Sequence, residues 1–159
     1  MPTTLDIKEP GLNVLPPGVE RHTVNMGGLT GLQIFPDDQI EIINEEGNQI
    51  CEIICFDKNG KSELGILSLK ENIKKSFIKE ILNNNDESSL ITKLQLKKRN
   101  LNINNSKSSI IFDKDTPSGE KVKLKSKDKC YVIFSAPKNE MLISDQNPSG
   151  DLTIFIKRA

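Results

Sequence analysis

The chain has 159 residues, with 22 basic and 22 acidic side chains, one histidine and three cysteines. This length suits one domain with a single core, and the balanced charge argues against nucleic acid or an anionic membrane as a partner. No apolar run approaches the roughly 18 residues of a membrane span, so we expect a cytoplasmic protein whose thiols stay reduced.

The chain begins with breakers of regular structure, ending in Leu15-Pro16-Pro17-Gly18. We therefore predict an extended N-terminal arm over residues 1–18 and a single β-rich domain over residues 19–159. Val19 to Val24 predicts the first strand. The glycines that follow it lack the Gly-Lys-Ser/Thr spacing of a phosphate loop, so they indicate turns before a second strand from Leu32 to Phe35.

Two β-rich runs then flank a turn that ends in glycine. Gln39 to Ile43 and Asn48 to Phe56 are separated by Asn44 to Gly47, a pattern typical of a β-hairpin. Neither face of the second run is wholly polar, because side chains alternate between the two faces of a strand. We therefore expect the second run to be a central strand.

One helix is predicted near residues 68–83. Ser68 and Glu71 have the spacing of a capping box, and apolar side chains follow at the helical period until Asn83 to Asn85. The next segment, with Leu90, Leu94 and Leu96, fits a short helix or a strand equally well.

The remaining elements are predicted to be strands separated by Pro-Ser-Gly turns. Residues 34–42 and 124–132 resemble each other as strand, acidic corner and strand, as in a jelly-roll duplication. Regular short strands with one helical insertion predict an antiparallel β-sandwich or a partly closed barrel, jelly-roll-like or cupin-like. The five later strands are Ser109 to Phe112, Lys121 to Lys125, Cys130 to Ser135, Met141 to Ile143 and Leu152 to Ile156.

The sequence offers few groups for chemistry. A single histidine, His22, excludes any site that needs several imidazoles, including the usual cupin metal cage. Cys51 and Cys55 would lie roughly 13 Å apart along one strand, too far to share a metal ion. We therefore predict buried thiols, no metal and no catalytic residue, and we interpret the lysines of residues 121–129 as a solvated sheet face.

Two segments resemble a known family. Glu46-Gly47-Asn48-Gln49 and the strand that follows resemble the corresponding strand of the urea-carboxylase-associated domain family. Residues 131–137, 147–149 and 152–156 resemble the last strands of that family. Its members are known as small proteins of urea and guanidine metabolism and as N-terminal extensions of glycine-cleavage T-protein-like aminomethyltransferases. The N-terminal arm and the Asn48-Gln49 strand look most like the second kind.

The resemblance implies a non-catalytic accessory or ligand-binding domain. Active members carry an Asp-Thr-Cys and a His-Asp pair that this chain lacks, so only Asn48, Gln49 and Glu52 transfer as ligand-binding candidates, with a structural role as the alternative. The implied partner is an aminomethyltransferase-like domain of one-carbon metabolism, fused or separate, that uses tetrahydrofolate. This chain itself would hold no cofactor.

Two other functions stay open at this point. A free-standing hydrolase or deiminase would need Cys55, Cys130 or Glu52 to converge with His22. A metal-free, cupin-like module that binds a small molecule would instead need an apolar cavity with a few polar groups.

Overall fold

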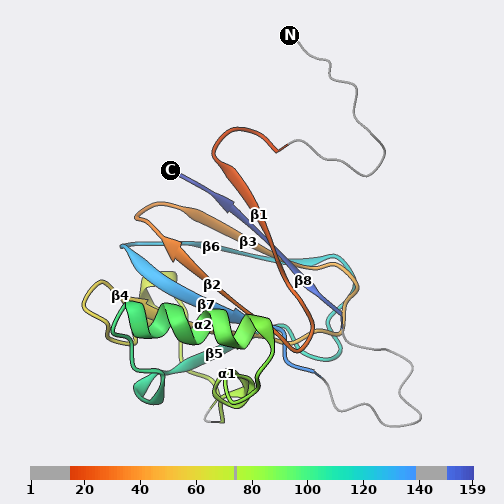
Figure 1. Cartoon of the computed structure of the whole chain (residues 1–159). Coiled ribbons are helices and arrows are strands. Elements are labelled where there is room, and N and C mark those ends of the chain that lie inside the picture. The colour runs from red at the N-terminus through yellow and green to blue at the C-terminus, as the bar shows by residue number, and fades with distance from the viewer. Residues whose placement is uncertain (1–14, 74, 139–149) are drawn as a thin grey trace.

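The computed structural model describes residues 15–73, 75–138 and 150–159. Two four-stranded antiparallel sheets face each other, with strand orders β1-β8-β3-β6 and β2-β7-β4-β5 (Figure 1). This confirms the predicted β-sandwich. The strands are β1 (Val19–Val24), β2 (Leu29–Ile34), β3 (Gln39–Asn44), β4 (Cys51–Asp57), β5 (Ser108–Ile111), β6 (Glu120–Lys125), β7 (Cys130–Ser135) and β8 (Leu152–Lys157). Most of the predicted arm and the whole strand predicted at residues 141–143 lie outside the described residues.

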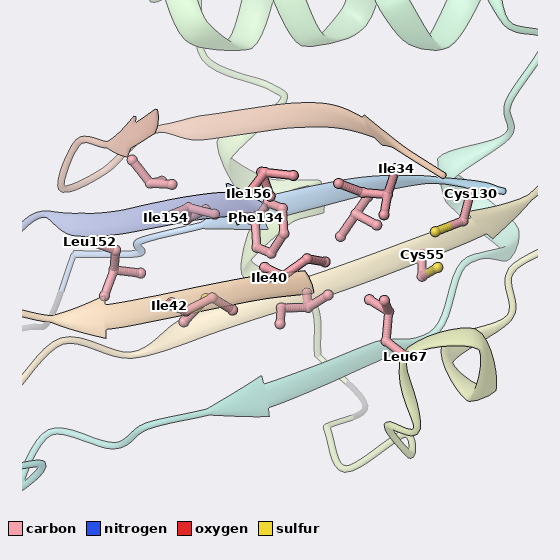
Figure 2. Close-up of a cluster of buried hydrophobic side chains, with 14 of the residues drawn as sticks. Ile34, Ile40, Ile42, Cys55, Leu67, Cys130, Phe134, Leu152, Ile154 and Ile156 are labelled. Carbon is pink, nitrogen blue, oxygen red and sulfur yellow. The ribbon is translucent and has the colours of Figure 1, made fainter. Parts of the chain in front are cut away.

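The core between the sheets consists mainly of aliphatic side chains (Figure 2). Every second residue of each central strand points inward. The inner positions of β8 are fully buried isoleucines or leucines, and so are those of β3 apart from Asn44 at its end. Branched side chains pack well on a pleated surface, which explains how a chain with few aromatic residues fills this space. The best-buried members include Ile34, Ile40, Ile42, Phe134, Leu152, Ile154 and Ile156.

A helical layer covers the outer face of the β2-β7-β4-β5 sheet (Figure 1). It contains α1 (Phe77–Ile81) and α2 (Glu87–Lys98), and the 3₁₀ turns η1 (Leu64–Leu67) and η2 (Ile103–Asn105) lie in the same connection. Ile54 and Phe56 of β4 pack under this layer, whereas Cys51, Ile53 and Cys55 face the other sheet. β4 is therefore central, as predicted, and buried on both faces.

The predicted hairpin is wrong. β3 pairs with β6 and β8, whereas β4 pairs with β5 and β7 in the opposite sheet. Gly47 (φ 80°) and Asn48 (φ 62°) turn the chain across the sandwich, and the side-chain amide of Asn44 donates to the Gln49 carbonyl at 2.8 Å. Consecutive left-handed residues also suit a hairpin turn, so this local pattern does not decide between the two connections.

The predicted helix near residues 68–83 begins too early. Ser68 does not cap a helix, because it ends η1 in a left-handed conformation (φ 60°). Asn72 then bonds to the backbone of Ile110 at the edge strand β5, with distances of 2.6 and 2.9 Å. These tertiary bonds outweigh the helical pattern, and α1 begins only after Ser76, its N-cap. The segment with Leu90, Leu94 and Leu96, whose sequence fits a helix or a strand equally well, forms α2.

The two acidic corners that resemble each other in sequence lie side by side. The Asp37 amide donates to the Ser126 carbonyl at 2.8 Å, and the Ser126 amide donates to the Asp38 carbonyl at 3.0 Å. Each corner carries the chain from one sheet to the other. The paired corners close one end of the sandwich and position the Asp38 side chain there.

Candidate functional site

The three predicted ligand-binding residues do not form one site. Glu52 lies on the face of β4 that packs under the helical layer, in register with Ser135 of β7. Gln49 precedes β4 at the turn that crosses the sandwich, where its side chain bonds to Pro137. Asn48 contributes its left-handed backbone to that turn, and its amide donates to the Thr116 carbonyl at 2.8 Å.

Glu52 is a fully buried carboxylate with four hydrogen-bond donors around it. One oxygen accepts from the amides of Phe77 and Ile78 at 2.7 and 3.1 Å, at the start of α1. The other accepts from the hydroxyls of Ser76 and Ser108 at 2.6 and 2.7 Å. Both oxygens are thus occupied, and the side chain joins β4, β5 and α1.

The end of the sandwich around Gln49 holds two buried acceptors without donors. The Gln49 amide nitrogen donates to the carbonyls of Ile50 and Pro137 at 2.7 and 2.9 Å, but its side-chain oxygen has no partner. Asn44 shows the same pattern, with its nitrogen bonded to the Gln49 carbonyl and its oxygen unpartnered. Sequence reasoning missed Asn44, because it reads as a turn residue and its burial comes from the crossing connection.

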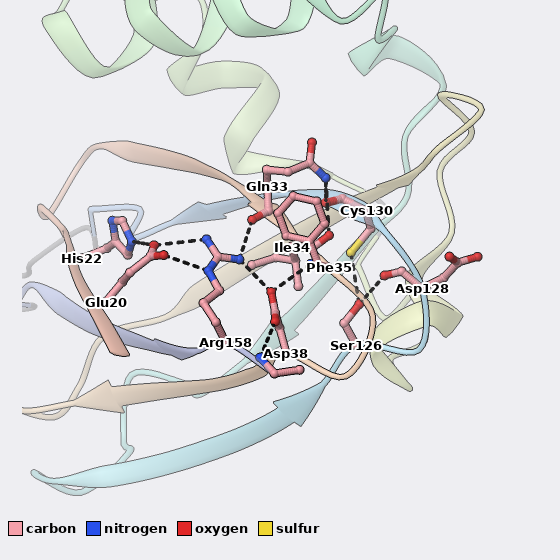
Figure 3. A network of polar contacts seen from close by, with 11 residues as sticks. Glu20, His22, Gln33, Ile34, Phe35, Asp38, Ser126, Asp128, Cys130 and Arg158 are labelled. Carbon is pink, nitrogen blue, oxygen red and sulfur yellow. Dashed lines mark hydrogen bonds and ion pairs between the residues drawn. The ribbon is translucent and has the colours of Figure 1, made fainter. Parts of the chain in front are cut away.

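A polar network surrounds Arg158, directly after β8 (Figure 3). Its guanidinium donates to both carboxylate oxygens of Glu20 at 2.8 and 3.1 Å. It also donates to the Asp38 carboxylate at 2.7 Å and to the Gln33 carbonyl at 2.9 Å. His22 lies at the margin, with its Nε2 atom 3.0 Å from Glu20. The network ties β1 and β8 of one sheet to β2 of the other.

The network brings the Arg158 guanidinium together with two carboxylates, those of Glu20 and Asp38. The hydrogen bond from Arg158 is the main cause that lowers the pKa of Glu20 to about 2, and the hydrogen bond to His22 adds to the effect. The Glu20 carboxylate, which lies beside His22, is therefore held by two hydrogen bonds from the Arg158 guanidinium. In the described structure the side chain of His22 bonds to Glu20. The cysteines lie in the core between the sheets and Glu52 lies beside α1, so these residues do not converge with His22 as a hydrolase would need.

The three cysteines are buried and free, as predicted. Burial raises the pKa of the Cys51 thiol, and a hydrogen bond with Cys130 together with burial raises the pKa of the Cys55 thiol. Cys55 and Cys130 lie on neighbouring strands with their sulfurs close together (Figure 2). In the described part of the chain, no group of three or more His, Cys, Asp or Glu side chains is placed to hold a metal ion.

A groove of about 630 Å³ lies on the outer face of the β1-β8-β3-β6 sheet. Phe155, Val19 and Pro16 supply its apolar surface. Charged side chains border it, with Glu41 on β3 and the lysines Lys123, Lys125 and Lys157 on β6 and β8. Lys123 pairs with Glu41 and Lys125 with Asp37, each at 3.8 Å, whereas no ion pair within the described residues engages Lys157. An apolar surface beside this one unpaired lysine suits a small anion with a flat apolar body. The lysines of β6 thus lie on an exposed sheet face, but they border a groove.

The fold and these sites can be set beside known proteins. No family model matches the chain. The chain is 32% identical over 153 residues to the trimethylamine-oxide aldolase of Ruegeria pomeroyi. The matched region covers 96% of this chain and 19% of that enzyme. The chain therefore corresponds to one portion of a larger enzyme, of which it spans about a fifth.

This match supports the predicted link to a larger enzyme. It does not extend to the urea-carboxylase-associated family, for which no model matches. The remaining four-fifths of the Ruegeria pomeroyi enzyme lie outside the matched region. Among the described residues, no helix has the length and apolar character that crossing a membrane requires.

Proposed function

We propose that this chain is a non-catalytic accessory domain of a larger enzyme that acts on methylated amines, whether fused to its catalytic part or separate. The observation that carries the proposal is the match along nearly the whole chain to one-fifth of trimethylamine-oxide aldolase. A T-protein-like aminomethyltransferase as the catalytic part belongs to the same proposal, because such enzymes take a one-carbon unit from an amine. Tetrahydrofolate is accordingly the proposed acceptor in the catalytic part.

The arrangement of reactive groups supports an accessory role. A nucleophile needs an exposed, activated side chain with a base within reach. The cysteines are buried, Glu52 is surrounded by four donors, and His22 shares its carboxylate with Arg158. These groups stabilise the sandwich in the described structure, and none of them lines the groove on the outer sheet face.

A chimera tests the proposal. The chain would replace the matching 153-residue segment of the Ruegeria pomeroyi enzyme, and consumption of trimethylamine oxide would be measured for the chimera, for the enzyme lacking the segment, and for the isolated chain. We expect turnover by the chimera, much lower turnover without the segment, and none by the isolated chain. Turnover by the isolated chain would overturn the accessory role. A fully active enzyme without the segment would do the same.

A second candidate function is the binding of a small molecule in the groove. Lys157, the lysine of this border that no ion pair within the described residues engages, disfavours a methylated ammonium ion and favours an anion. Phe155 offers a surface for a flat ring. Folates fit this description better than methylated amines or urea. A thermal-shift panel of the three ligand classes checks it, with Phe155→Ser and Lys157→Glu as variants in which a folate response should be lost. A response that survives in both variants would exclude the groove.

A further inference from the structure

Helix α2 is oriented with three of its four apolar side chains, Leu90, Ile91 and Leu94, outward. It buries Ser89, Thr92 and Leu96 against the sheet. Leu90, Ile91 and Leu94 are instead 47%, 51% and 67% exposed. A surface helix ordinarily turns its apolar stripe to the core and its polar face to water. The exposed stripe, defined by Leu90, Ile91 and Leu94, therefore calls for a physical explanation.

Specific contacts fix this orientation. The buried hydroxyl of Ser89 donates to the Ile81 carbonyl at 2.8 Å, and Asp86 caps the helix by accepting from the Ser89 amide at 2.8 Å. Ser88 accepts from the amide of Leu29 in β2 at 3.3 Å. Rotating the leucines inward would break these bonds and leave buried polar groups without partners. The apolar stripe thus stays on the surface of the folded chain.

The charges beside the stripe are arranged with a two-fold pattern. Glu87 lies three residues before Leu90, and Lys97 lies three residues after Leu94. At the rise of an α-helix both charges are about 4.5 Å beyond the leucines, in opposite directions. The side chains at positions 87, 90, 94 and 97 share one face, since they are three or four residues apart. No ion pair within the described residues engages Glu87 or Lys97.

We propose that a second copy of this chain covers the stripe, through antiparallel packing of two α2 helices. A two-fold axis midway between positions 90 and 94 places Leu90 of each copy against Leu94 of the other. The same axis places each Glu87 beside the other copy's Lys97. Parallel packing would instead bring like charges together, so the sequence of the face selects the antiparallel pair. α2 lies on the outside of its sheet, where a second helix has access (Figure 1).

The expected dimer is weak. One pair of three-turn helices buries less area than the 1,200–2,000 Å² or so of a standard stable interface. We therefore expect a dissociation constant on the order of 10 μM, which electrostatic screening by salt will raise. This inference does not depend on the proposed enzymatic context, because it concerns the chain by itself.

Sedimentation equilibrium of the purified chain, from about 1 to about 500 μM, tests the proposal. Leu94→Glu should raise the dissociation constant at least about tenfold. Glu87→Lys and Lys97→Glu should each weaken the dimer several-fold, and the double variant should recover most of the affinity, as a double-mutant cycle requires. Lys114→Glu, an exposed charge reversal in the connection between β5 and β6, is the matched control and should leave the affinity unchanged.

Circular dichroism confirms in each case that the variant remains folded. A wild-type chain with the 17.8 kDa monomer mass at every concentration would overturn the proposal and leave the stripe for another part of a larger enzyme. A dimer that tolerates Leu94→Glu would also overturn it, because its interface would lie elsewhere. Failure of the charge swap to recover affinity would refute the antiparallel arrangement.

Discussion

Replacing the buried carboxylate of Glu52 distinguishes a structural role from ligand binding. In Glu52→Gln the shape is retained, and the oxygen that accepts from the Phe77 and Ile78 amides can remain. The new NH₂ group meets the hydroxyls of Ser76 and Ser108, which lose their acceptor. Since a hydrogen bond to a charged group contributes about 1.5–3 kcal/mol, we expect a net loss of about 2 kcal/mol after the hydroxyls rotate.

Glu52→Ala removes all four hydrogen bonds and leaves the buried amide of Ile78 and the part-buried amide of Phe77 without an acceptor. Each such donor costs about 1–3 kcal/mol, so the total approaches 5 kcal/mol and leaves little of a typical domain's stability. Ser108→Ala removes one bond and should cost about 1 kcal/mol. Ser135→Ala is the matched control: Ser135 is also buried and lies opposite Glu52, but its hydroxyl has no partner. We expect a change within about 0.5 kcal/mol there.

Urea unfolding followed by circular dichroism measures these differences. With a slope of about 2 kcal/mol/M, the Glu52→Gln variant should unfold at a midpoint about 1 M lower than the wild type. A midpoint equal to or above that of the wild type would refute the reasoning, because burying the charge would then cost more than its hydrogen bonds return. Unchanged stability combined with loss of ligand binding would instead assign Glu52 to a binding site.

Three further predictions concern other parts of the sandwich. Gly31→Ala should destabilise the fold by about 1–3 kcal/mol, because the added Cβ would lie 1.9 Å from the Tyr131 hydroxyl. Tyr131→Leu in the same chain should recover part of this loss. An unchanged urea midpoint for Gly31→Ala would contradict the prediction. Because the pKa of Glu20 is lowered from 4.5 to about 2, its pairing with Arg158 stabilises the fold fully above pH 4.5 and progressively less as the pH falls to 2. Arg158→Gln should flatten this part of the acid-unfolding profile, and an identical pH dependence in the variant would exclude the pair as its source. Finally, the three cysteines should resist Ellman's reagent at pH 8 in the folded chain and all react in urea; rapid labelling of the native protein would show that the thiols are accessible.

Much of the strand layout could be predicted from the sequence. β1 and β7 have the predicted bounds, and the other described strands differ by one to three residues at their ends. The reason is that strand formation here follows from alternation of branched apolar residues, which is a local pattern. Of the residues on β4, burial of Cys51 and Cys55 follows from the same pattern, because neither face of this strand is wholly polar.

The pairing of strands was decided by tertiary structure. The turn at Gly47 and Asn48 is compatible with a hairpin, yet the chain crosses to the other sheet because β7 and β5 offer β4 partners on both edges. Ser68 and Glu71 have the spacing of a capping box, but Asn72 bonds to β5 instead. In each case a local preference of about 1 kcal/mol yields to several hydrogen bonds with distant residues.

The sequence by itself thus determined the class of fold, the aliphatic core and the absence of a multi-histidine centre. Only the tertiary structure decided which strands meet, which donors surround Glu52, and that α2 presents Leu90, Ile91 and Leu94 to solvent. Periodicity reports which side chains share a face, because it is a property of one segment. It does not report which face turns inward when polar contacts from another segment, such as those of Ser88 and Ser89, compete with apolar burial.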